Sequence, residues 1–255
     1  MVSFTGSTRA GIAVAAAAAP TVKRVHQELG GKAPNLVLEG ADLQAVLPPT
    51  VQGVLANSGQ SCIAPTRMLV HRSDKAAAEA VVKAIVSATP VDAPDREGMH
   101  LGPVVNKAQF DKIQELIQSA IDEGATLLHG GTGLPDNVNR GYYIRPTAFS
   151  DVTPDMRISR EETFGPVATI SVYEDIAQGI AMANDTEYGL SATVSGDPEA
   201  AKAVVGKLRA GLVTVNSWGP NTNAPFGGYK KSGNGREYGK YGLADFMEVK
   251  TIVGA

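Results

Sequence analysis

The sequence predicts an α/β fold with an open, largely parallel sheet, and two observations carry that prediction. Short apolar runs typical of strands alternate along the whole chain with longer runs of helical periodicity. The clearest helical run covers residues 106–123 and ends at Gly124. Its apolar face is formed by Phe110, Ile113, Ile117 and Ile121. Such alternation favours βα units over separate blocks of strands and helices.

The chain opens with a strand-turn-helix pattern. Residues 2–4 are predicted as a strand, and the small polar residues after them predict a turn. The alanine-rich run over residues 9–19 predicts a helix that ends at Pro20, because alanine is the best helix former. The turn lacks the glycine spacing of a dinucleotide fingerprint and the lysine of a P-loop. A plain Ser or Thr N-cap is therefore favoured over a phosphate site.

The remaining elements follow from the same two patterns. Strands are predicted where short runs lie between turn residues, at 23–27, 35–38, 67–71, 125–128, 142–146, 167–173, 190–195 and 212–216. Further helices are predicted after Ser, Asp or Pro start signals, at 73–88, 175–184 and 198–210.

The regular alternation of predicted strands and helices ends after residue 216. Residues 216–228 form a predicted long loop that contains the only tryptophan, and long loops in compact domains are often functional. A surface loop with merely packing aromatics is the alternative. An alternating run over residues 246–253 predicts a terminal strand with no hairpin partner, and such a strand is a candidate for pairing between subunits.

Composition excludes several classes of function. A net charge of −3 gives no basic field for nucleic acid. No apolar run has the length of about 20 residues that a membrane span needs. A single cysteine and no export signal point to a reducing, cytoplasmic setting. No cluster of His, Cys and carboxylate residues has the spacing of metal ligands, so no metal site is expected.

Cys62 is the sole cysteine, so it forms neither an intramolecular disulfide nor a thiolate metal site. It is either an inert small side chain or a nucleophile. Gly59 and Pro65 flank it, and its other neighbours are small and polar, which favours an exposed turn over a packed strand. A cysteine hydrolase needs a histidine partner, and none of the four histidines belongs to a recognisable Cys/His signature.

Two acidic positions are further candidates. Glu28 ends a predicted strand just before two glycines, which let the backbone turn and present a carboxylate into a cleft. A surface glutamate beside a solvated lysine is the alternative. Glu161 and Glu162 precede a Phe-Gly-Pro turn, where they form either a hydroxyl-binding site with an aromatic wall or a solvated acidic turn.

Four motifs stand in one order along the chain: Glu-Leu-Gly-Gly-Lys, Gly-Gln-Ser-Cys, Glu-Glu-Thr-Phe-Gly-Pro and Pro-Phe-Gly-Gly-Tyr-Lys-Lys-Ser-Gly. This set closely resembles the aldehyde dehydrogenase superfamily, over residues 2–253. The resemblance covers about the C-terminal half of a typical member. It implies the catalytic α/β domain of that fold, a remnant of the Rossmann-like cofactor domain and a C-terminal oligomerisation strand.

The resemblance also implies a division of the chain. Residues 1–30 correspond to the last part of the NAD(P)-binding domain, and residues 31–230 to the catalytic domain. Residues 231–255 correspond to a segment that returns to the cofactor domain and then supplies the oligomerisation strand. A homo-oligomer, a dimer or a tetramer, is expected on this basis, with no nucleic acid or membrane partner.

The residue roles implied by the resemblance are specific. Cys62 attacks the aldehyde carbon to form a thiohemiacetal, which gives up hydride to NAD or NADP and becomes a thioester. Glu28 is the general base for the water that hydrolyses the thioester, and the backbone N–H of Cys62 helps to hold the oxyanion. The implied cofactor-binding residues are Gly6, Ser7, Leu29, Glu162 and Phe164. Trp218 and Phe226 match the aromatic substrate entrance, the former loosely.

Two functional hypotheses remain open. In the first, the chain is part of an NAD(P)-dependent enzyme that oxidises an aldehyde to a carboxylic acid and is truncated at its N-terminal half. In the second, it is a folded catalytic-domain remnant that lacks dehydrogenase activity and acts as a Cys62 esterase or an assembly module. We expect little or no dehydrogenase turnover by the chain alone, because the resemblance implies that much of the cofactor site lies outside it.

Overall fold

The computed structural model describes residues 1–254 and contains two sheets. The larger sheet has seven strands in the order β5-β6-β7-β4-β3-β8-β9. All its neighbouring pairs are parallel except β5 with β6. Its strands are β3 (Pro34–Val37), β4 (Arg67–His71), β5 (Thr126–His129), β6 (Thr147–Ser150), β7 (Val167–Tyr173), β8 (Ser191–Ser195) and β9 (Leu212–Val215). The α/β class predicted from the sequence is confirmed.

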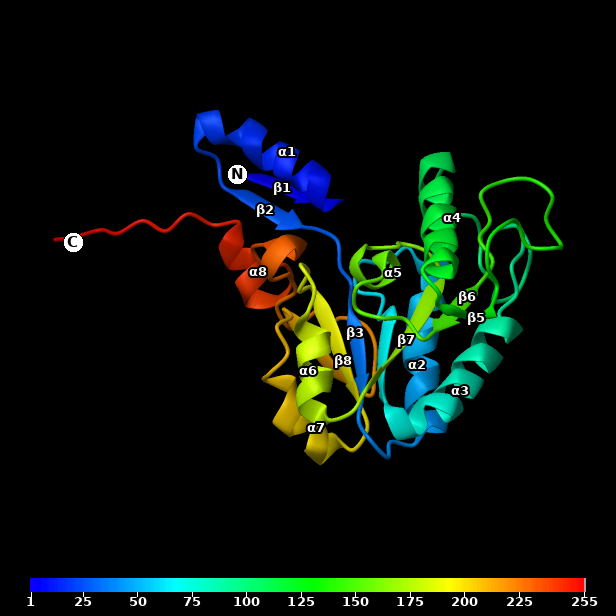
Figure 1. Cartoon of the computed structure of the whole chain (residues 1–255). Coiled ribbons are helices and arrows are strands. Elements are labelled where there is room, and N and C mark those ends of the chain that lie inside the picture. Colours follow the sequence, from blue (N-terminus) through cyan, green and yellow to red (C-terminus); the bar gives the residue numbers. More distant parts are fainter. Residues whose placement is uncertain (255) are drawn as a thin grey trace.

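Helices cover both faces of this sheet (Figure 1). α2 (Leu43–Leu55) and α3 (Lys75–Ala88) pack on one face, and α6 (Ile176–Asn184) and α7 (Pro198–Val205) on the other. The strands are buried on both sides because successive side chains alternate between the two faces. In β4, for example, Met68 and Val70 enter one core cluster while Leu69 enters the other.

The predicted helix over residues 106–123 is present as α4 (Lys107–Asp122). Asn106 caps it by accepting a hydrogen bond from the backbone N–H of Gln109 at 2.9 Å. Gly124 follows it with φ of 94°, a conformation that favours glycine. Its apolar face packs on strand β6 and on the short helix α5 (Arg157–Arg160). Four short 3₁₀ turns complete the set, at Ala19–Thr21, Ala56–Gly59, Arg72–Asp74 and Lys230–Ser232.

The smaller sheet joins three strands from opposite ends of the chain: β1 (Val2–Thr5), β2 (Val25–Glu28) and β10 (Gly233–Asn234). β2 lies in the middle, parallel to β1 and antiparallel to β10. Helix α1 (Thr8–Ala18) packs against β1 and β2 (Figure 1). Residues 29–33 then lead from β2 directly into β3, so the two sheets meet where the candidate residues lie.

Helix α2 was missed by the sequence interpretation. It contains Pro48 and Pro49, and proline inside a helix removes a backbone donor and crowds the preceding turn. The helix forms nonetheless because its other face is fully buried, with Leu47, Val51 and Val54 all at 0% exposure. Tertiary burial therefore overrides the local preference.

Two predicted boundaries are wrong. The strand expected over residues 142–146 lies instead at β6, because Pro146 has no N–H for a ladder and pairing starts at Thr147. The backbone N–H of Thr147 donates to the carbonyl of Pro166 at 2.9 Å. The helix expected over residues 198–210 ends at Val205, with Gly206 as its C-cap.

The C-terminal segment also differs from the prediction. A short helix, α8 (Gly239–Asp245), was missed, and Phe246 is its C-cap rather than the start of a strand. The following residues extend away from the body of the molecule without a strand partner among residues 1–254 (Figure 1). Val249 is 97% exposed and Val253 is 90% exposed. Pairing of this segment with a second subunit stays a prediction.

None of the helices in the described part of the chain is both long enough and apolar enough to span a bilayer.

Candidate active site

Cys62 lies in a tightly constrained loop between α2 and β4. Asn57, Ser58 and Gly59 have φ of 52°, 56° and 73°, three consecutive residues in the left-handed region. Two of these are not glycine, and such conformations persist only where the surroundings enforce them. Here the Ser58 hydroxyl donates to the carbonyl of Gly102 at 2.8 Å, and Gln60 accepts from the backbone N–H of Val105 at 2.9 Å.

Two glycines bring other segments against this loop. A Cβ on Gly59 would lie 2.0 Å from the carbonyl carbon of Gly165, so the loop touches the Phe-Gly-Pro turn directly. A Cβ on Gly31 would lie 2.3 Å from the carbonyl oxygen of Cys62. The motifs around Glu28, Cys62 and Glu162 therefore meet at one place, although they are far apart in the sequence.

Glu162 points at the two glycines that follow Glu28. Its Oε1 accepts a hydrogen bond from the backbone N–H of Gly31 at 2.9 Å, and a Cβ on Gly30 would lie 2.3 Å from its Oε2. Burial raises the pKa of Glu162, while the Gly31 N–H and the nearby charges of Lys112 and Lys32 lower it. The solvated acidic turn considered from the sequence is therefore wrong for Glu162.

The turn that carries Glu162 is held by helix α4. The Gln109 amide donates to the carbonyls of Thr163 and Phe164 at 3.0 and 2.9 Å. Lys112 donates to the carbonyl of Glu162 at 2.6 Å. Phe164 has φ of 51° and is half-buried beside Glu162. These contacts fix the carboxylate relative to Gly31 and hence to the cysteine loop.

Glu28 ends strand β2 and is 3% exposed, so the surface glutamate considered from the sequence is also wrong. Both of its carboxylate oxygens are buried without a hydrogen-bond partner among the described residues. A Cβ on Gly227 would lie 2.8 Å from Glu28 Oε1, so the glycine leaves room for the carboxylate. Burial raises the pKa of Glu28 to about 8, with a further rise from Glu237 and a lowering by Arg236.

The thiol of Cys62 is half-buried and its pKa is raised to about 11. Burial is the largest cause, and the carboxylates of Glu162, Glu28 and Glu237 add to it. Only the backbone N–H of Cys62 itself acts in the opposite direction. The group is therefore a neutral thiol at pH 7, and it needs a base to become a nucleophile.

This raised pKa predicts how Cys62 reacts with iodoacetamide. Because only the thiolate is alkylated, the rate should rise roughly tenfold per pH unit from pH 7 to 10. Intact mass measured over time gives that rate. The same chain unfolded in urea serves as the control, since its thiol has an ordinary pKa and its rate should level off near pH 9. A folded-chain rate that levels off below pH 9 would contradict the prediction.

Apolar side chains form one wall beside Cys62. Phe226, Ile63 and Leu190 are buried together, and the cysteine and Trp218 pack against them. The Trp218 side chain packs against helix α2, where a Cβ on Gly53 would lie 2.7 Å from the indole ring. Its ring N–H is buried without a hydrogen-bond partner among residues 1–254. The two aromatic residues singled out from the sequence therefore lie together at the cysteine.

Gly6 and Ser7 lie at the N-terminus of α1, next to the backbone of Glu28. Ser7 is the N-cap and accepts from the backbone N–H of Ala10 at 3.3 Å, as the plain capping interpretation predicts. The backbone N–H of Gly6 donates to the carbonyl of Glu28 at 3.0 Å. Leu29 is buried against Gly11 of the same helix, so its side chain faces away from Glu28.

Two more residues connect these segments and were missed. Ser232 is fully buried, donates to the carbonyl of Gly30 at 2.7 Å and accepts from the backbone N–H of Gly189 at 3.0 Å. His26 is buried on the same strand face as Glu28, and no motif in the sequence marked it as functional. The two-residue spacing of His26 and Glu28 in a strand is the signal that could have found it.

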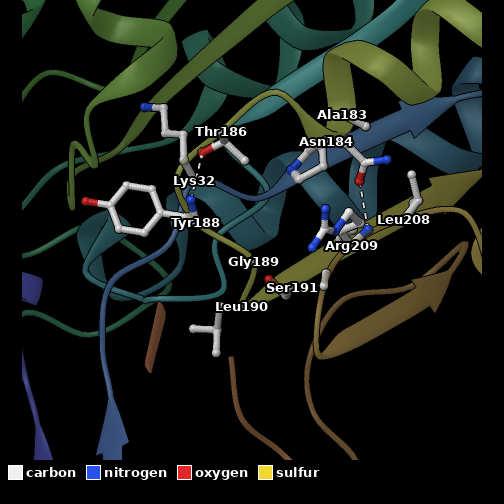
Figure 2. A pocket seen from close by; sticks show the side chains of 13 residues that line it. Lys32, Ala183, Asn184, Thr186, Tyr188, Gly189, Leu190, Ser191, Leu208 and Arg209 are labelled. Atoms are coloured by element: carbon white, nitrogen blue, oxygen red, sulfur yellow. Dashed lines mark hydrogen bonds between the residues drawn. The ribbon is translucent and has the colours of Figure 1, made fainter. Parts of the chain in front are cut away.

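Lys32 is buried next to this site and its Nζ donates to the hydroxyl of Thr163 at 3.1 Å. Burial lowers its pKa to about 7, with a further lowering by Arg67. Figure 2 shows Lys32 beside Tyr188 and Thr186 at a pocket. The volume of this pocket is about 10 Å³, which has room for a single water and not for an organic ligand. A larger pocket of about 570 Å³, lined by His129 and Arg145 among others, does not include Cys62.

Within residues 1–254, no group of three or more His, Cys, Asp or Glu side chains is arranged to hold a metal ion.

The tight contact at Gly59 predicts a large effect on stability. In the variant Gly59→Ala, the new methyl group meets the Gly165 backbone and the left-handed conformation becomes strained. We expect a loss of about 3 kcal/mol or more in the free energy of unfolding, measured in urea. Gly206→Ala is the matched control, because a Cβ there has nothing within 4 Å and should change stability by less than about 1 kcal/mol. Equal losses in the two variants would contradict the argument.

Comparison with known proteins agrees with this geometry. The chain is 47% identical, over all 255 residues, to 3-succinoylsemialdehyde-pyridine dehydrogenase from a Pseudomonas species, of which it covers 54%. It is similar to the structure of an aldehyde dehydrogenase C mutant from Pseudomonas syringae in complex with NAD+ and octanal. There the TM-score is 0.97 and the identity 50%, over 100% of this chain and 53% of that one.

An aldehyde dehydrogenase from Mycobacterium tuberculosis in complex with NAD+ gives a TM-score of 0.92 at 38% identity, over 96% of this chain and 50% of that one. The chain thus spans about half the length of the relatives it matches. The family model of the aldehyde dehydrogenase family matches residues 1–252 of this chain. With the fold, the four motifs and these relatives in agreement, the chain belongs to the aldehyde dehydrogenase family.

Proposed function

We propose that the site around Cys62 oxidises an aldehyde to a carboxylic acid with NAD or NADP, through a covalent adduct on the cysteine. The single observation that carries this proposal is the meeting of Cys62, Glu28 and Glu162 at the glycine pair 30–31. A nucleophile that packs on an apolar wall, a base without a hydrogen-bond partner among the described residues and a carboxylate suited to a hydroxyl are thereby combined in one site. Family membership supports the reaction class.

In the first step Cys62 adds to the aldehyde carbon. The thiol must lose its proton, because its pKa of about 11 leaves little thiolate at neutral pH. As the sulfur attacks, this proton passes to solvent water, which the half-buried thiol still reaches, so Glu28 keeps its capacity to accept a proton in the hydrolysis step. The product is a thiohemiacetal whose oxygen is stabilised by the backbone N–H of Cys62.

The bound nicotinamide would accept hydride from the adduct carbon, which leaves a thioester on Cys62. Glu28 then accepts a proton from water as the water oxygen adds to the thioester carbon, and the carbon–sulfur bond breaks. A carboxyl group whose pKa is about 8 suits a base that must both take and release protons near neutral pH. Its unpartnered oxygens leave it free to bind that water.

The residues present fit a dinucleotide cofactor. Glu162 is fixed at Gly31 through Oε1, and Oε2 has no hydrogen bond to residues 1–254, which suits a ribose hydroxyl. Gly6 and Ser7 lie at the N-terminus of an eleven-residue helix, where backbone N–H groups favour a phosphate. Phe164 borders Glu162. Leu29 is proposed to contact the cofactor only through its backbone, because its side chain packs on Gly11.

The apolar wall of Phe226, Ile63 and Leu190, with Trp218 packed against it, indicates an aldehyde with an apolar body. The Pseudomonas syringae relative was crystallised with octanal, which agrees with that class of substrate. The exposed segment after α8, which includes Val249 and Val253, is proposed to pair with a second subunit. Residues 1–30 and β10 are proposed to belong to the cofactor domain, since they form a sheet of their own, and residues 31–230 to the catalytic domain.

A Cys62 esterase is the second candidate, because Cys62 and Glu28 suffice in principle to form and hydrolyse a thioester. The purified chain is incubated with octanal and NAD or NADP and followed at 340 nm, and separately with p-nitrophenyl acetate. Reduced cofactor above the level of the Cys62→Ser variant supports aldehyde oxidation. Nitrophenolate release without reduced cofactor is the result expected of this chain alone and supports ester chemistry at Cys62, whereas absence of both signals would overturn both candidates.

A further inference from the structure

The middle strand of the small sheet presents two ionisable side chains on one face. Side chains two residues apart in a strand point the same way, so His26 and Glu28 face together away from α1. Gln27 and Leu29 face the helix instead, where the Gln27 amide donates to the carbonyl of Gly11 at 2.6 Å. The His26 side chain is 2% exposed and the Glu28 side chain 4% exposed.

His26 connects this buried face with carboxylates nearer the surface. Its Nε2 lies 4.0 Å from Glu28 Oε1 and 3.7 Å from Glu237 Oε1. Its Nδ1 lies 3.3 Å from Oδ2 of Asp245, at the end of α8. The side chain of Glu237 is 31% exposed, so a proton that reaches it can exchange with water.

The proposed reaction releases a proton at Glu28, which is buried, so this proton needs a route to solvent. Hydrolysis of the thioester consumes one water and yields a carboxylate, the Cys62 thiol and one proton, which Glu28 holds at first. The oxygens of Glu28 have no hydrogen-bond partner in residues 1–254, so no hydrogen bond within this part of the chain carries the proton onward from them. The ring nitrogen Nε2 of His26 is likewise buried and without a hydrogen-bond partner.

We propose that His26 is a positioning and proton-relay residue that carries protons from Glu28 to Glu237, nearer the surface. Asp245 accepts the Nδ1–H of the ring and holds that tautomer. Nε2 accepts the proton of Glu28 and then gives it to Glu237, whose side chain is 31% exposed, so the ring returns to its starting state. The 4.0 Å separation exceeds a hydrogen bond, so transfer requires rotation of the Glu28 side chain or one bridging water. This inference rests on the proposed function.

Several groups set the charge around the His26 ring. From β2 and the segment after β10 come the carboxylates of Glu28 and Glu237, and from α8 comes Asp245. Arg236 lies between these segments, and its backbone N–H donates to Asp245. The Phe246 ring lies 5.7 Å from the imidazole and covers it. The ring is therefore held by packing and has carboxylates at both nitrogens.

The test follows the acetyl group on Cys62. p-Nitrophenyl acetate should give a burst of one nitrophenolate per chain as Cys62 is acylated, followed by slower turnover that reports deacylation. In His26→Ala we expect the burst to remain, with deacylation slowed at least about tenfold at pH 7. Added imidazole should restore the rate, while pyrazole, a ring of the same size and much lower basicity, should not. His71→Ala is the matched control, since His71 also contacts a carboxylate but lies on β4.

Each outcome has one meaning. Deacylation of His26→Ala within about twofold of the parent overturns the relay, as does a slowed rate that imidazole does not restore. Restoration by pyrazole as well also overturns it, because filling the space then suffices. Imidazole must leave Glu28→Gln unaffected, since direct attack on the thioester would otherwise explain the rescue and overturn the relay. Absence of the burst in the parent overturns the proposed function itself, which separates that failure from failure of the relay.

Discussion

The variant Cys62→Ser should lose ester hydrolysis by at least about a thousandfold, because it removes the only thiol in the chain. A serine hydroxyl has a far higher pKa than a thiol, so it is far less nucleophilic near neutral pH. The measurement is nitrophenolate release under the conditions of the burst experiment. Any reaction with aldehyde and cofactor should vanish together with it.

The fold gives this prediction a clear control. Serine is smaller than cysteine, and Cys62 is only half-buried beside Phe226, so the free energy of unfolding should change by less than about 1 kcal/mol. Ser87→Ala, on the exposed face of α3, should keep full activity. Hydrolysis by Cys62→Ser within tenfold of the parent would show that the nucleophile is elsewhere.

The sequence was sufficient to single out Cys62 as a candidate nucleophile but not to describe the electrostatics around it. Periodicity located most strands, and the order of four motifs identified the family, because those motifs are local in the chain. The close approach of Gly31 to Cys62 and of Gly30 to Glu162 is a property of how β2, β3 and the cysteine loop fold together. No spacing along the chain encodes those distances, so burial of the carboxylates was left as one of two alternatives.

The errors share the same physical origin. Pro48 and Pro49 argue locally against a helix, yet burial of α2 against the sheet decides the outcome. His26 has no motif of its own, and its role as a neighbour of Glu28 depends on α8, which comes more than 200 residues later in the sequence. Where long-range packing supplies the energy or the partner, local patterns are insufficient.

The variant Glu28→Gln is expected to separate the two halves of the reaction. Glutamine keeps the size of the side chain but cannot accept a proton, so the thioester on Cys62 should form and then persist. We expect deacylation to slow by about 100-fold or more. Intact mass after addition of p-nitrophenyl acetate should show the acetylated chain accumulating. Glu97→Gln, an exposed substitution, should leave no such adduct. Rapid loss of the acetyl group in Glu28→Gln would contradict the role of general base.

The same substitution should change stability in a way that only a buried base explains. The pKa of Glu28 is about 8 in the folded chain and near 4.5 when unfolded, so between these values the unfolded chain binds fewer protons. Stability contributed by this group therefore falls as pH rises through that window, by an amount on the order of a few kcal/mol. The pKa of Lys32 is lowered to about 7, so its contribution to the free energy of unfolding rises with pH, but only above about pH 7. The range from pH 5 to 7 therefore reports on Glu28.

In that range the free energy of unfolding of Glu28→Gln, relative to the parent, should increase with pH. Other groups titrate alike in the two proteins, so their contributions cancel in the difference. A difference that does not depend on pH would mean that Glu28 is solvated or paired in solution. Such pairing would also deprive it of the free oxygens that bind and deprotonate water. The destabilising burial of this carboxylate and its capacity as a base thus have one structural cause, the absence of a hydrogen-bond partner for Oε1 and Oε2 within the described chain.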